Sequence, residues 1–157
     1  MADPSIVDPE SAVVEIVAAE RLVRDDPGAA RIAAQRVIEA ASDAGRLDLR
    51  ARAHYVLAQA AASAGELGEA LMLIDRSQRD FEAIGRIAEA LRTNLGRINV
   101  LNELGRHVEA IATGEAVLAA LQILEVDPDD ANRLGAAAQQ NLGLCYELTG
   151  RFSEALA

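Results

Sequence analysis

The segment GELGEA at residues 65–70 recurs with variation as GRHVEA at residues 105–110 and as GRFSEA at residues 150–155. The three copies share the pattern Gly-x-x-x-Glu-Ala, and successive copies begin 40 and then 45 residues apart. A step of 40 residues back from Ala70 reaches Ala30, which lies just after an Asp-Pro-Gly turn sequence. Repetition at a period of this length indicates a chain built from stacked supersecondary units.

The residue types in this pattern predict the corner of a helical hairpin. Glycine readily adopts the left-handed conformation that ends a helix, and a small alanine soon afterwards lets the next helix approach closely. Apolar residues at helical spacing precede the corners, for example Val13, Val17, Ala18 and Leu22 in the first repeat. Asp8 and Asp26 each precede a proline and are predicted N-caps. With the other caps and breakers they predict helices near residues 9–25, 27–43, 47–64, 67–84, 87–104, 107–125 and 130–149, and an eighth that begins near residue 151.

Composition agrees with closely packed helices. Hydrophobic residues make up 51% of the 157 residues but aromatic residues only 3%, so the core must consist of Ala, Leu, Ile and Val. All 15 basic residues are arginine, which is a good helix former, and the absence of lysine is typical of a GC-rich bacterial gene. We therefore expect one all-α domain.

Charge and the N-terminal sequence limit the partners and the compartment. The formal net charge of −10 argues against nucleic acid and anionic membranes, because both attract basic surfaces, and it favours a cationic partner segment. Acids and two prolines occupy the first ten residues, where a signal peptide needs a basic and then an apolar stretch. The most apolar long stretch, residues 108–126, contains three glutamates. These features predict a soluble, cytoplasmic protein.

Residues 141–155 (NLGLCYELTGRFSEA) resemble the tetratricopeptide repeat family, with a Leu-Gly pair, a tyrosine three residues later, and then glycine, an aromatic residue and alanine. Leu57 with Gly65 and Ala70 forms a weaker copy, and the Leu-Gly pair at residues 95–96 lies two residues early in the third repeat. The spacing of 40 residues exceeds the family period of about 34. Longer helices would absorb the difference, as in variants from bacterial signalling proteins and from proteins with a CHAT caspase-like protease domain.

The resemblance implies a right-handed superhelix, or α-solenoid, of about four helix-turn-helix repeats at residues 9–45, 46–85, 86–126 and 129–157, the last incomplete. In such a superhelix the first helices of the repeats line a concave groove that binds peptides or partner domains. The chain is accordingly expected to be a non-catalytic scaffold for protein or peptide binding. The alternative is a sensor or regulatory arm of a larger signalling or CHAT-protease-type enzyme.

The repeat register predicts which polar residues face that groove. They come from the first helices of three repeats and are Arg52, Tyr55, Gln59, Arg92, Asn99, Asn102 and Gln140. Asn and Gln amides can pair with a peptide backbone, and Arg can bind a carboxylate. A solvated polar face without a ligand is the alternative, and a shift of two residues near residue 95 would turn Asn99 and Asn102 away from the groove.

No catalytic, cofactor or metal site is expected. His54 and His107 stand alone in the sequence, and Cys145 lies on an apolar helix face, where a small buried side chain is the simpler interpretation. Asp127 and the acids at residues 129 and 130 lack the glycine and the closing glutamate of a calcium loop, so helix capping explains them better.

The predicted last repeat contains only about two turns of its second helix. Leu142, Tyr146 and Phe152 would then be partly uncovered, whereas repeat proteins usually close with a complete, polar-faced helix. We therefore expect the N-terminal part of a longer protein, and a homodimer that forms through the C-terminal hairpin.

Overall fold

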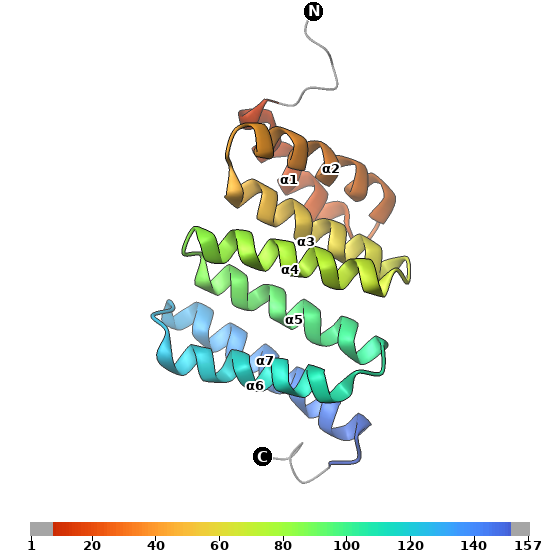
Figure 1. Ribbon diagram of the computed structural model, residues 1–157, viewed down its shortest axis with the longest axis vertical. Helices are drawn as coiled ribbons and strands as arrows, with labels where there is room; N and C mark the ends of the chain where they lie inside the picture. Colours follow the sequence, from red (N-terminus) through yellow and green to blue (C-terminus); the bar gives the residue numbers. More distant parts are fainter. Residues whose placement is uncertain (1–7, 152–157) are drawn as a thin grey trace, which may run out of the picture. The chain divides into compact units, whose positions relative to one another are not determined.

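The computed structural model describes residues 8–151, and these residues form seven α-helices joined by short turns (Figure 1). The helices are α1 (Pro9–Leu22), α2 (Pro27–Asp43), α3 (Leu47–Ser63), α4 (Leu67–Ala83), α5 (Ile87–Glu103), α6 (His107–Ile123) and α7 (Pro128–Leu148). The described part of the chain contains no strand, so the predicted all-α fold is confirmed. The predicted eighth helix lies outside the described residues.

The chain divides into two compact units, Met1–Gly85 with α1 to α4 and Arg86–Ala157 with α5 to α7. In unit 1 each helix packs against the next one, and α1 also contacts α3. In unit 2 the contacts are α5 with α6, α6 with α7, and α5 with α7. Within each unit, therefore, consecutive helices pack as hairpins and the first helices of successive hairpins are neighbours, as in a helical-repeat protein. The boundary between the units coincides with the repeat boundary predicted between residues 85 and 86.

The helices repeat at half the period visible in the sequence motif. Each helix from α2 to α6 is 17 residues long, and each helix from α3 to α6 begins 20 residues after the one before it. The turns between α2 and α6 each contain a glycine with a positive φ, which at Gly105 is 72°. There the N–H of Arg106 donates to the carbonyl of Leu101 (2.8 Å), the backbone bond that closes a Schellman C-cap.

The glutamate of the Gly-x-x-x-Glu-Ala motif pairs with arginine. Arg106, directly after its glycine, donates from Nε and Nη2 to both carboxylate oxygens of Glu109 at 2.6 Å each. This hydrogen bonding lowers the pKa of Glu109. In the preceding copy, Glu66 and Glu69 both accept from Arg31 of α2. These described motif glutamates are thus held in ion pairs at the corners of the hairpins.

Three helices begin with an aspartate followed by proline, which combines an N-cap side chain with a residue that needs no N–H partner. Asp8 and Asp26 cap α1 and α2 as the sequence predicted. Asp127 does the same for α7, where its Oδ1 accepts from the N–H groups of Asp129 (3.0 Å) and Asp130 (3.4 Å). Helix α7 consequently begins at Pro128 and not near residue 130; the capping role is confirmed for Asp127, whereas Asp129 and Asp130 lie in the first turn of the helix.

Alanine and branched aliphatic residues fill both cores. In unit 1 the buried residues of α1 are Ala12, Ile16 and Ala19, and its C-cap residue Val23 is also buried, at 5% exposed. The predicted stripe in this helix was wrong by about one residue, since Val13 is 38% and Leu22 40% exposed. Nearly every residue from 12 to 19 is apolar, so periodicity alone could not select the buried face. In unit 2 the core is formed by Leu91, Val117, Leu134 and Ala138.

Leu142 of α7 also belongs to the core. It is 5% exposed, so the prediction that it would be partly uncovered was wrong. The physical reason is that α6 carries Gly114 opposite this leucine, and the missing side chain leaves room for it. Leu144 and Leu148 of the same helix are 49% and 53% exposed. No helix in the described residues is long and apolar enough to span a membrane.

Candidate functional site

The first helices α3, α5 and α7 share a pattern of polar residues that the second helices lack. Their sixth residue is always arginine, and their thirteenth is always a side-chain amide; the residues are Arg52 and Gln59, Arg92 and Asn99, and Arg133 and Gln140. Positions seven residues apart lie on the same side of a helix. The second helices α2, α4 and α6 have no side-chain amide at either of these two positions. At the sixth position they also have no charged residue.

The three amides are available to a ligand. Gln59, Asn99 and Gln140 are all exposed, and their amide groups form no hydrogen bond with any residue between 8 and 151. Asn99 thus shares both its helix position and its exposure with Gln59, while the groove predicted for them stays a prediction. An exposed amide offers both a donor and an acceptor, which is what pairing with a peptide backbone requires.

Arg133 was missed by the sequence analysis. Its side chain is 74% exposed, and it occupies in α7 the position that Arg52 occupies in α3 and Arg92 in α5. The signal was present in the sequence as Asp127-Pro128, the same start that was recognised for α1 and α2. With the start of α7 placed at residue 130, the equivalence with the other two arginines was hidden.

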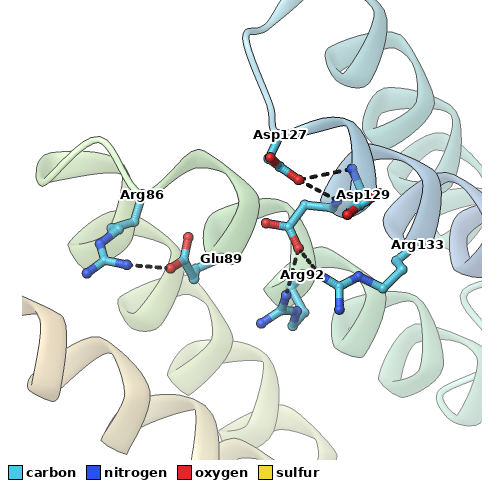
Figure 2. A network of polar contacts seen from close by, with 7 residues as sticks. Arg86, Glu89, Arg92, Asp127, Asp129 and Arg133 are labelled. Carbon is cyan, nitrogen blue, oxygen red and sulfur yellow. Dashed lines mark hydrogen bonds and ion pairs between the residues drawn. The ribbon is translucent and has the colours of Figure 1, made fainter.

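Arg92 and Arg133 of unit 2 meet at one aspartate, which Figure 2 draws without a label. Arg133 donates to Oδ1 of Asp130 at 2.6 Å, and Nη2 of Arg92 lies 3.8 Å from the same oxygen. Figure 2 also shows Arg86 bound to Glu89 at the start of α5. A single carboxylate therefore faces two guanidinium groups that come from α5 and α7, and Arg92 remains 52% exposed beside it.

Arg52 of unit 1 is held more tightly. Its Nε and Nη2 donate to both carboxylate oxygens of Glu20 in α1, each at 2.7 Å. This bidentate bond raises the pKa of Arg52 further above its ordinary value. Tyr55, one turn further along α3, is half-buried. A ligand carboxylate at Arg52 would have to compete with Glu20.

Asn102 differs from the other predicted amides because it is bound within the chain. Its Nδ2 donates to Sγ of Cys145 at 3.1 Å, and its Oδ1 lies 3.1 Å from Nδ1 of His107. Cys145 is fully buried, as the sequence predicted. Asn102 therefore links the end of α5 to α6 and α7, and its amide is already occupied.

A second polar cluster, between α3 and α4, was not anticipated. Arg50 donates from Nε and Nη2 to Asp80 at 2.8 and 2.6 Å, and Nδ1 of His54 lies 3.5 Å from Oδ2 of the same carboxylate. Arg50 occupies the fourth position of its helix, where α2, α4, α5 and α6 all have alanine. That exception was the available signal, but the partner 30 residues away is a tertiary contact that the repeat pattern does not reveal.

The described residues contain no group of three or more His, Cys, Asp or Glu side chains arranged to hold a metal ion. Comparison of the chain with protein-family models, with curated proteins and with solved structures found no match.

Proposed function

We propose that the chain is a non-catalytic binding module for a peptide or an extended protein segment, with contacts offered by α3 of unit 1 and by α5 and α7 of unit 2. The observation that supports this proposal is the shared arginine at the sixth position and the shared exposed amide at the thirteenth position of α3, α5 and α7. Three separate helices carry the same pair of residues at the same positions, whereas the helices that alternate with them do not.

The chemistry of the pair suits a peptide. The amides can donate to backbone carbonyls and accept from backbone N–H groups, while guanidinium groups bind carboxylates in a planar, two-point geometry. Because Arg92 and Arg133 share the single carboxylate of Asp130, they can bind a second anionic group. We further propose, on the residues that resemble the family, that the chain is a divergent tetratricopeptide repeat protein with hairpins longer than usual.

The test starts with a library of random linear peptides displayed on phage and selected on the full chain. The affinity of a selected peptide is then measured by calorimetry for Gln59→Ala, Asn99→Ala and Gln140→Ala. Loss of one amide hydrogen bond of about 1 kcal/mol should weaken the binding of a unit 1 peptide about fivefold in Gln59→Ala, and that of a unit 2 peptide about fivefold in Asn99→Ala and in Gln140→Ala.

Two exposed amides of the second helices provide matched controls, Gln35 of α2 and Gln122 of α6. Gln35→Ala and Gln122→Ala should bind the peptide as the unmodified chain does. If no peptide is selected, or if the control variants lose as much affinity as the first-helix variants, the proposed binding face is wrong.

A further inference from the structure

The cluster of Arg50, His54 and Asp80 plays no part in the binding face proposed above, and it contains a poorly satisfied histidine. His54 is 8% exposed, and its Nδ1 is buried without a hydrogen-bond partner. Oδ2 of Asp80 lies 3.5 Å from Nδ1, but that oxygen already accepts from Nε of Arg50 at 2.8 Å. A buried, unpaired polar nitrogen is uncommon in folded proteins because it has lost its water without gaining a partner.

The charged groups around the imidazole oppose its protonation. Asp80 of α4 attracts a positive charge at His54, but Arg50 of α3 and Arg76 of α4 repel it. No charged group of α1 or α2 in the described residues bears on the ring. Among the described residues, Asp80 is the carboxylate that attracts the charge, and it is shared with an arginine. The protonated ring would also have to be buried away from water.

We propose that His54 makes unit 1 acid-sensitive: protonation of its imidazole weakens the packing of the α3–α4 hairpin. The neutral ring fits its site between the two helices, whereas the imidazolium does not. Mild acidification consequently shifts the population toward a form in which this hairpin is open and His54 is hydrated.

The direction of the pH dependence follows from linkage. Burial, followed by the repulsion from Arg76 and Arg50, lowers the pKa of His54 below its ordinary value of 6.5 despite the attraction of Asp80. Above pH 6.5 the ring is neutral in both the closed and the open form, so its contribution to stability is fully present. As the pH falls below that value the open form binds a proton first, and stability is lost until the closed form is protonated as well.

Hydrogen exchange of the full chain tests the proposal. Protection of the amides in α3 and α4, corrected for intrinsic exchange and compared with that of α6, should fall by up to about tenfold between about pH 7.5 and about pH 5.5. Carboxylates do not confound this window, because their ordinary pKa values lie below it.

The variants separate His54 from other causes. His54→Gln removes the titrating group. In this variant the protection of α3 and α4 relative to that of α6 should therefore not change over the same pH range. The chain has one other histidine, and His107→Gln should retain the pH dependence. If the unmodified chain shows no loss, or if His54→Gln loses as much protection, the proposal is wrong.

A second measurement applies even if His54→Gln does not fold. The ring protons of the two histidines can be followed by NMR in the unmodified chain and assigned with His107→Gln. His54 should titrate below the ordinary value of 6.5. Titration at or above that value would overturn the proposal.

Discussion

Gly114 of α6 faces Leu142 of α7 so closely that a Cβ on the glycine would lie 2.7 Å from Cγ of the leucine. Both residues are buried, and the contact brings two helices of unit 2 together. Small residues occupy other places where the helices approach closely. Ala30, Ala70 and Ala110, for example, are fully buried near the start of the second helices.

Gly114→Ala is therefore expected to destabilise unit 2. The added methyl group must displace the Leu142 side chain or separate the helices, which should cost about 1–3 kcal/mol. This outweighs the better helix propensity of alanine, which is worth about 1 kcal/mol at most. Chemical unfolding followed by circular dichroism measures the change, since the chain has no tryptophan to report by fluorescence.

Gly143→Ala is the matched control for that variant. Gly143 lies inside α7, and a Cβ built on it would meet no atom within 4 Å. This substitution should leave the stability unchanged or raise it. Equal losses in the two variants would show that the approach of Gly114 to Leu142 does not limit the packing.

The sequence was sufficient for the helices because each boundary has a local cause. The glycines at the corners and the Asp-Pro pairs placed every described helix end but one within two residues, and the larger of the remaining differences have local reasons as well. Helix α6 ends at Ile123 because Leu124 is extended, with ψ of 145°. Helix α1 ends at Leu22 and not near residue 25, since Asp25 and Asp26 form a turn onto the carbonyl of Leu22.

The candidate site was predictable only in part, because exposure and pairing depend on tertiary contacts. Gln59, Asn99 and Gln140 are exposed on the first helices, while the groove that the register assigned to them stays a prediction. It could not reveal that Asn102 binds Cys145, which lies 43 residues away, or that Glu20 holds Arg52 from a distance of 32 residues. Arg50 with Asp80 was missed for the same reason.

The ion pairs Arg50–Asp80 and Arg52–Glu20 should differ in their contribution to stability although both are bidentate. The Asp80 side chain is 11% exposed and that of Glu20 is 39% exposed. Asp80→Asn leaves a buried polar site with the wrong partner and should cost about 1.5–3 kcal/mol. Glu20→Gln breaks a solvent-exposed pair and should cost less than about 1 kcal/mol. The free energies of unfolding of both variants at neutral pH provide the comparison, and equal values would contradict it.

Arg133→Ala should weaken peptide binding with little effect on folding. Its side chain is mostly exposed, and its bond to Asp130 spans a single turn of α7, so the loss of stability should stay below about 1 kcal/mol. An arginine that binds a ligand carboxylate contributes about 1.5–3 kcal/mol, equivalent to a loss of affinity of about tenfold or more.

The control for Arg133 is Arg79→Ala in α4. Arg79 is also exposed, and it occupies the thirteenth position of a second helix. Affinity measured for a peptide selected on the unmodified chain should be the same for Arg79→Ala as for that chain. If Arg133→Ala also retains full affinity, α7 does not contribute its arginine to the binding face.

Asn99→Ala and Asn102→Ala, only one turn apart on α5, should have opposite effects. Asn99 is exposed and its amide is unpaired in the described residues, so its replacement should change the stability by less than about 0.5 kcal/mol while lowering peptide affinity. Asn102 binds both Cys145 and His107, and its removal should cost about 1 kcal/mol of stability with the affinity of the folded protein retained. Unfolding and binding must be measured on both variants, because a double substitution would combine the two effects. Loss of affinity in Asn102→Ala at a temperature where the variant is fully folded would show that the ligand displaces Cys145 or His107 from this amide.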